Sequence, residues 1–228
     1  MLYDDFYNLS CLMEFIPILP LCVFKQNCPR GLIRSIYFLV FLKCIIIIIS
    51  FTPIQYTILT GINVIDFVEN IYLLCSFIAI SIIYKVILDK LISKVFLFGT
   101  LFFVAILILN LFLTDCRVSL LNYGVAASNL VFSSYGLLYF TMYSKNKSTY
   151  KLKYFWLNIA LLVYNSLMFF AMTVSKLIIN DKWGDIQSTL WSIVVLSSIL
   201  FNVFLMVFLY KNRVKNISKD ELLEGITY

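Results

Sequence analysis

The chain has 228 residues, of which 62% are hydrophobic and only 13% are charged, and its net charge is +6. Soluble domains have roughly a quarter of their residues charged, so this composition excludes an ordinary soluble enzyme or nucleic-acid-binding domain. The excess of Lys and Arg is better explained by membrane topology and contact with anionic lipid.

Seven apolar runs follow one another along the chain and predict an all-α membrane protein, a seven-transmembrane helix bundle. We predict helices at residues 6–24, 35–54, 66–84, 95–114, 118–142, 154–175 and 187–210, followed by a tail at 211–228. Seven helices of ~20 residues use about 140 residues, so no length remains for a soluble catalytic domain. Because the loops are short, sequential helices are expected to be antiparallel neighbours in one bundle.

The basic residues cluster in every second gap between these runs. Fourteen of the 18 Lys and Arg residues belong to four such clusters: Lys25, Arg30 and Arg34; Lys85, Lys90 and Lys94; Lys145, Lys147, Lys151 and Lys153; Lys211, Arg213, Lys215 and Lys219. Only Arg117, Lys176 and Lys182 lie in the alternate gaps. Since Lys and Arg mark cytoplasmic loops, we predict the N-terminus outside and the C-terminus inside.

The first apolar run has two features of its own. Asp4 and Asp5 precede it and no small-residue cleavage site follows it, so we expect a retained helix and not a signal peptide. Pro17 and Pro20 lie within it, and proline removes a helical hydrogen bond. The helix is therefore predicted to be kinked or locally unwound there.

Two opposite charges lie deep in the first two predicted helices. Glu14 precedes Lys25 by eleven residues, or ~16 Å along a helix, and Lys43 follows Arg34 by nine, or ~13 Å. The two charges are therefore expected at similar depth on adjacent helices. A lone charge in hydrocarbon costs about 3 kcal/mol or more, so a pair is predicted. It is either a proton- or ligand-sensitive site, or a structural ion pair, or a neutralised Glu14.

The other intramembrane polar residues form two groups. Asp66, Glu69 and Asn70 open the third helix on one face, where acidic residues favour the helix dipole or line an outer pocket. Buried asparagines are predicted in the last three helices, at Asn129, Asn158, Asn165 and Asn202. Asn129 belongs to a stripe of small and polar residues that includes Ser133 and Gly136, and Asn202 shares a face with Trp191 and Ser198. This polar interior holds water or a ligand, or ties the helices together.

The residues that are missing limit the chemistry. The chain has no histidine, which removes His-centred acid–base catalysis, His-ligated haem and most zinc sites. No phosphate-binding glycine loop, nucleophile elbow or carboxylate cluster is present. We therefore predict no catalytic residues, no metal site and no cofactor. Cys11 and Cys116 both lie near the predicted outer face, but their spacing does not establish a bridge.

Several aromatic and polar segments carry a family resemblance. They are Glu14 with residues 16–20, Asn63 with residues 68–72, residues 154–158 with 163–164, and residues 190–193 with 201–202. In these segments the chain resembles a group of small seven-span inner-membrane proteins of Bacteroidetes-type bacteria. The resemblance implies seven helices in a bacterial inner membrane. Related bundles resemble the membrane sensor regions of histidine kinases, although no kinase portion is recognised in this sequence.

These observations lead to one functional prediction and two alternatives. A polar interior, a basic cytoplasmic face and no output domain favour a sensor or accessory membrane protein without catalytic activity, signalling to a separate cytoplasmic or membrane partner. A small transporter or channel with a polar pathway through the bundle is the first alternative. A membrane-acting defence effector is the second. The lipid bilayer is a predicted partner in each case, and nucleic acid is not.

Overall fold

The computed structural model describes residues 11–51, 64–88, 93–113, 120–145, 152–177 and 184–213. They form the helices α2 (Ile18–Val23), α3 (Arg30–Phe51), α4 (Val64–Leu88), α5 (Ser93–Leu113), α6 (Leu120–Lys145), α7 (Phe155–Leu177) and α8 (Gly184–Lys211), with a 3₁₀ turn (Leu152–Tyr154) before α7. No β-strand occurs within these ranges, and the predicted all-α class is confirmed.

Four stretches of these helices are long and apolar enough to cross a membrane: Arg30–Ile48, Ile71–Leu88, Leu152–Val174 and Ser192–Lys211. Cys11–Val23 and Lys94–Leu109 are shorter apolar helices. Large apolar side chains also cover the outer faces, for example Phe98 of α5, which is 72% exposed. A helix that is apolar on every face is typical of a membrane span, so the chain has the character of a membrane protein.

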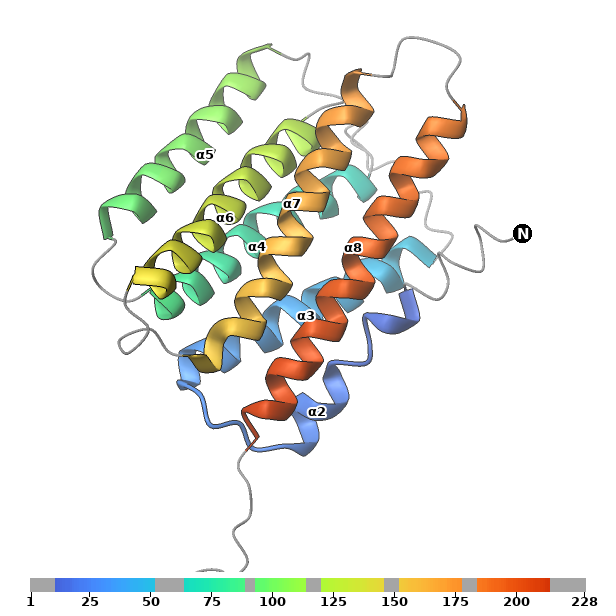
Figure 1. The fold of residues 1–228 in the computed structure, drawn as a ribbon. Helices are drawn as coiled ribbons and strands as arrows, with labels where there is room; N and C mark the ends of the chain where they lie inside the picture. The colour runs from blue at the N-terminus through green and yellow to red at the C-terminus, as the bar shows by residue number, and fades with distance from the viewer. Residues whose placement is uncertain are drawn as a thin grey trace, which may run out of the picture.

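The helices form one bundle (Figure 1). Within it, α6 packs against α4 and α5, and α7 packs between α6 and α8. The sequential pairs α3 and α4, α5 and α6, α6 and α7, and α7 and α8 pack together, as predicted. The sequential pair α4 and α5 does not pack closely along its length, and the two helices meet through the stacked rings of Phe77 and Phe103. The packing of α4 against α6 is not sequential, and it leaves α5 at the edge of the bundle (Figure 1). The short α2 lies against α3 and α8.

Small residues on α6 explain why its neighbours approach so closely. A Cβ atom at Gly136 would lie 3.0 Å from Leu162 of α7 and 3.1 Å from the Tyr84 hydroxyl of α4. One turn before Gly136 on α6, Ser133 accepts a 3.2 Å hydrogen bond from Ser166 of α7. Small residues and serine hydroxyls are the usual means by which membrane helices pack, and Gly136 and Ser133 of the stripe lie in such contacts.

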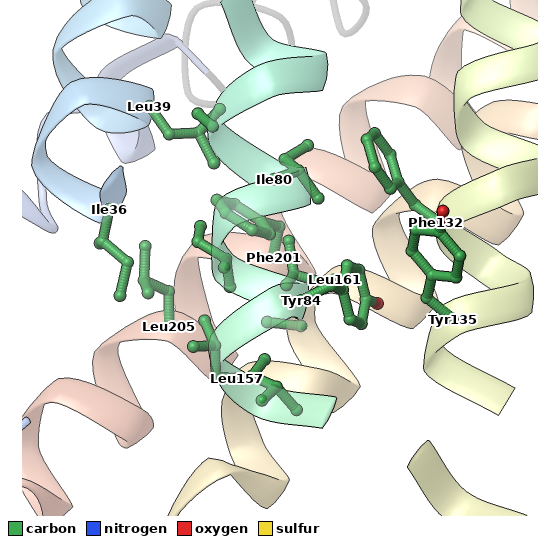
Figure 2. Close-up of a cluster of buried hydrophobic side chains, with 14 of the residues drawn as sticks. Ile36, Leu39, Ile80, Tyr84, Phe132, Tyr135, Leu157, Leu161, Phe201 and Leu205 are labelled. Atoms are coloured by element: carbon green, nitrogen blue, oxygen red, sulfur yellow. The ribbon is translucent and has the colours of Figure 1, made fainter. Parts of the chain in front are cut away.

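The hydrophobic core lies on both sides of α4. Figure 2 shows Tyr84 of α4 beside Phe132 and Tyr135 of α6. The ring of Tyr84 lies 6.1 Å from that of Phe132 and 5.6 Å from that of Tyr135, between centroids. On the other side of α4, the core continues to Ile36 of α3 (Figure 2). This packing fixes the helices around the site described next.

The first apolar run is broken, as its prolines predict. Between Cys11 and Ile18 the backbone makes hydrogen bonds of three-residue spacing, such as Glu14 N–H to the Cys11 carbonyl at 3.3 Å. Regular α-helix resumes only after Pro17, as α2. Residues 6–10 of the predicted span lie outside the described residues. The break places Glu14 in a turn that faces α3 and α8.

Candidate functional site

Glu14 and Lys43 form a buried ion pair at the centre of the site. The Lys43 ammonium lies 3.3 Å from both carboxylate oxygens of Glu14, and each side chain is only 7% exposed. The Ser198 hydroxyl of α8 donates a further hydrogen bond to Oε1 of Glu14. The contact predicted from matched depth is therefore confirmed, and it joins three separate elements.

The surroundings of Lys43 stabilise its charge in a second way. Its ammonium lies 4.5 Å from the ring centre of Tyr164 and 4.3 Å from that of Phe201. A cation over an aromatic face gains roughly 0.5–2 kcal/mol, more when it is removed from water. Buried charges persist in proteins only when they are paired and hydrogen-bonded, and both conditions hold here. The cluster is electrically neutral as a whole.

A cavity of about 200 Å³ adjoins this cluster inside the bundle. Side chains of α3, α4, α6, α7 and α8 line it, and most of them are apolar: Leu39, Ile46, Leu73, Ile80, Val125, Phe132, Leu161, Met168, Met172 and Phe201. The polar lining residues are Lys43, Tyr72, Ser76, Ser128, Asn129, Tyr164 and Asn165. An apolar cavity with a few convergent polar groups is the usual form of a small-molecule site.

Several polar groups around the cavity donate to backbone carbonyls of their own helices. Ser76 donates to the Leu73 carbonyl at 3.0 Å, and Ser128 donates to that of Val125 at 2.9 Å. The Asn165 amide nitrogen donates to the Leu161 carbonyl at 2.5 Å. Its oxygen, Oδ1, is buried and has no partner among the described residues.

The structure places the predicted site residues in different parts of the bundle. Glu14 and Lys43 pair, and Asn129 and Asn165 line the cavity. The side chains of Glu69 and Asn70 lie outside the described residues although both residues belong to α4, so the predicted outer pocket is not addressed.

Two predicted asparagines lie elsewhere in the bundle. Asn158 of α7 donates to the Gly136 carbonyl of α6 at 3.3 Å, which ties these helices together. Asn202 of α8 is 1% exposed, and neither of its amide atoms has a hydrogen-bond partner in the described part of the chain. Neither residue is among those that line the cavity. Cys116, which the sequence places near the same outer face as Cys11, lies outside the described residues, so a bridge between them is not addressed.

Four residues of the site were not identified from the sequence as partners of the charge pair: Ser198, Tyr72, Tyr164 and Phe201. The Tyr72 hydroxyl is hydrogen-bonded to Tyr164, which itself lies under the Lys43 ammonium. Ser198 did carry a signal, since it shares a helical face with Asn202. Tyr72, Tyr164 and Phe201 lie in the segments that carry the family resemblance, but nothing in the sequence marked them as partners of a charge, because tyrosine and phenylalanine are frequent throughout the chain.

A second set of contacts links α2 to the start of the C-terminal tail. The Asn27 backbone N–H donates to the Asn212 carbonyl at 2.7 Å, and the Asn212 side chain donates to the Lys153 carbonyl at 3.2 Å. The Arg213 guanidinium lies 5.6 Å from the ring centre of Phe24. The segment that carries Glu14 is therefore attached to α8 at both of its ends.

Comparison with known proteins adds no candidate chemistry. The chain matches no protein-family model, and it shows no significant similarity to a curated protein or to a solved structure. In the part of the chain that the structure describes, no group of three His, Cys, Asp or Glu side chains is placed to hold a metal ion. The described arrangement is a neutralised charge pair beside a cavity.

Proposed function

We propose that this protein is an integral membrane sensor that binds a small molecule inside its bundle and signals to a separate protein, without catalytic activity of its own. One observation carries the proposal. The cavity is bordered by Lys43, and the partner of Lys43 is Glu14, which belongs to the N-terminal segment packed on α8. A molecule in the cavity therefore lies next to the charge pair that holds this segment.

The signal would pass from the cavity through α2 to the tail. A ligand against Lys43 and Tyr164 changes how firmly Lys43 holds Glu14, and so changes the docking of α2. The far end of α2 leads to Asn27, which is bonded to Asn212 at the start of the tail. A ligand shifts such an equilibrium only as far as its affinities for the two arrangements differ. Direct contact with Lys43 supplies such a difference.

We further propose seven spans in a bacterial inner membrane, with the N-terminus outside and the tail inside. Support comes from the charge asymmetry between alternate loops and from Lys153, Lys211 and Arg213, which meet at one end of the bundle around Asn212. Single-cysteine labelling in intact cells tests this topology. Positions 28, 91 and 148 should be protected, and positions 60, 116 and 184 should be labelled. Labelling at 148 from outside would refute the orientation.

Spin-label distances test the sensor mechanism. One label is placed on Cys22 of α2, which is exposed, and one at position 203 of α8, which is 41% exposed, in a background without other cysteines. The variant Lys43→Met should shift or broaden the distance distribution because it releases Glu14. Lys85→Met, which removes an exposed lysine at the end of α4, is the matched control and should leave the distribution unchanged. An unchanged distribution in Lys43→Met would contradict the mechanism.

A small transporter or channel is the second candidate, and the closeness of the cavity to a neutralised charge pair favours it. Buried ionisable residues in membrane helices often mark ion or proton pathways. Purified protein in liposomes loaded with a pH-sensitive dye distinguishes the two functions. The sensor should give no proton flux above that of empty liposomes. A flux that disappears in Glu14→Gln would replace the sensor by the transporter.

A further inference from the structure

The cavity beside the charge pair has a sealed floor and a less enclosed side. The side chains of its floor are at most 5% exposed: Leu39, Ile80, Phe132, Leu161 and Phe201. Those of the other side are only half-buried: Ile46, Tyr72, Val125, Met168 and Met172. They lie toward the end of α3, the starts of α4 and α6, and the end of α7, which share one end of the bundle (Figure 1). The volume of about 200 Å³ therefore sets no upper limit on the ligand, because part of it can extend through this side.

Most of the lining is apolar, so most of the ligand must be apolar too. Leu, Ile, Val, Phe and Met side chains form the greater part of the walls. Met168 and Met172 lie one turn apart on α7, and the unbranched thioether of methionine adapts to ligands of different shape. Small-molecule sites combine such walls with a few polar groups that fix the orientation of the ligand. The polar group that is free to do so here indicates the ligand class.

Asn129 is the polar lining residue whose hydrogen-bonding groups are free. The other polar residues of the described lining have partners: Lys43 pairs with Glu14, Tyr72 with Tyr164, and Ser76, Ser128 and Asn165 donate to backbone carbonyls. The Asn129 side chain makes no hydrogen bond within the described part of the chain, although the residue is only 5% exposed. An unpaired amide inside a bundle is unfavourable, so a ligand that pairs with it gains affinity.

The amide of Asn129 also remains within reach of a ligand. The unpaired amide atoms of Asn202 and the Oδ1 atom of Asn165 are completely covered by protein, but neither amide atom of Asn129 is covered in this way. Because Asn129 lines the cavity, the small accessible surface of its amide faces that space. An asparagine amide has an N–H donor and a carbonyl acceptor side by side. A ligand that pairs with both must have an acceptor and a donor side by side as well.

A carboxamide or a lactam has this arrangement and carries no charge. A carboxylate is disfavoured, because Lys43 is the one cation among the described lining residues and both oxygens of Glu14 already accept from it. We propose that the cavity binds a neutral carboxamide or lactam with an apolar body, and that Asn129 recognises the ligand amide through two hydrogen bonds. This inference rests on the sensor function proposed above and names the ligand class of the same cavity.

Fluorine NMR of the full chain in detergent tests the proposal with three probes of nearly the same shape. 4-Fluorobenzamide has a donor and an acceptor. 4-Fluoroacetophenone has a methyl group in place of the amide nitrogen and keeps the acceptor alone, and 4-fluorobenzoate is charged. Titrations give the affinity of each probe, corrected for its partition into empty micelles. 4-Fluorobenzamide should bind about 2- to 10-fold more tightly than 4-fluoroacetophenone, the value of one net hydrogen bond. 4-Fluorobenzoate should bind most weakly.

Two variants test the role of Asn129. Asn129→Leu replaces the amide by methyl groups and should bring the affinities of 4-fluorobenzamide and 4-fluoroacetophenone to within about 2-fold of each other. Asn202→Leu is the matched control, because Asn202 is also a buried asparagine without a hydrogen-bond partner in the described part of the chain but does not line the cavity. This variant should keep the preference for 4-fluorobenzamide.

The methionine methyl groups report where the probes bind. Met168 and Met172 line the cavity, whereas Met142 of α6 is not among the described lining residues. In protein labelled with ¹³C at the methionine methyl groups, the ring of a bound probe should shift the resonances of Met168 and Met172 and leave that of Met142 unchanged. These shifts and the ranking of the three probes are measured on the unmodified protein, so they test the proposal even where a variant fails to fold.

Each contrary outcome has a definite meaning. Equal affinity for 4-fluorobenzamide and 4-fluoroacetophenone in the unmodified protein would overturn the role of Asn129, while shifts at Met168 and Met172 would still support a binding cavity. Preference for 4-fluorobenzoate would overturn the neutral class. Loss of the amide preference in Asn202→Leu as well as in Asn129→Leu would overturn the assignment to Asn129. Absence of every bound signal would overturn the ligand proposal, and the spin-label result for Lys43→Met decides the sensor mechanism separately.

Discussion

Breaking the Glu14–Lys43 pair should show whether the two residues stabilise the bundle as a unit. The variants are Glu14→Gln, Lys43→Met and the double change. Glutamine keeps an oxygen that can accept from Ser198, so Glu14→Gln removes the charge and little else. Methionine keeps the length of the lysine stem and contacts the rings of Tyr164 and Phe201 through its sulfur.

The magnitude follows from the burial of the pair. Removing one partner of a buried pair costs about 3–5 kcal/mol because the other charge is left uncompensated. We expect each single variant to lose about 3 kcal/mol, the lower end, since Lys43 keeps two aromatic faces and Glu14 keeps the Ser198 hydroxyl. The double variant should recover part of this loss and be destabilised by only about 2 kcal/mol, because no charge is left alone. The coupling, which is the sum of the two single losses minus the loss of the double variant, is then about 4 kcal/mol, above the usual range for two residues in contact.

Reversible unfolding with SDS in mixed micelles, followed by tryptophan fluorescence, measures these free energies. Glu14→Gln combined with Lys85→Met is the control pair, because Lys85 is exposed on α4 and should couple to Glu14 by less than about 0.5 kcal/mol. Additive losses for the Glu14 and Lys43 variants, within the same limit of about 0.5 kcal/mol, would refute the argument that the two residues act together.

Other predictions concern packing, titration and the tail. Gly136→Ala should lose about 1–3 kcal/mol in the same unfolding assay, because its Cβ would lie 3.0 to 3.1 Å from neighbouring atoms, whereas Gly31→Ala, with nothing within 4 Å, should lose nothing. Burial raises the pKa of the Cys28 thiol. With Cys28 as the sole cysteine, its alkylation rate at pH 7.5 should be lower than that of a single cysteine at exposed position 25. The rate at Cys28 should also keep increasing with pH above the pH at which the rate of the exposed thiol becomes constant. Truncation after Asn216 should leave membrane insertion and the unfolding midpoint unchanged, and loss of the folded bundle would contradict this.

The depth of Lys43 could be predicted because it depends on one local quantity. The rise of a helix is nearly constant, so the distance of Lys43 from the basic boundary follows from counting residues along the regular helix α3. Glu14 lies in a turn before α2, so its height beside Lys43 is fixed by the tertiary structure. The burial of four asparagines could also be predicted, since an amide that faces lipid is unfavourable on any helix of the bundle: Asn129, Asn158, Asn165 and Asn202. The groups that these amides contact could not be predicted from the sequence. Asn165 belongs to the lining of a cavity and donates to a carbonyl of its own helix, whereas Asn158 donates to a carbonyl of α6, although the two are two turns apart on one helix.

The sequence by itself determined the helical class, the apolar stretches and the break at Pro17, because hydropathy, helical period and the missing proline N–H act within a few residues of each other. Only the tertiary structure decided that α4 packs on α6 and that Ser198 reaches Glu14. It also decided that a cavity remains beside Lys43. Which helix faces meet depends on how large and small side chains of all the helices fit at once, and Gly124 and Gly136 admit Leu73 and Tyr84 where larger residues would exclude them.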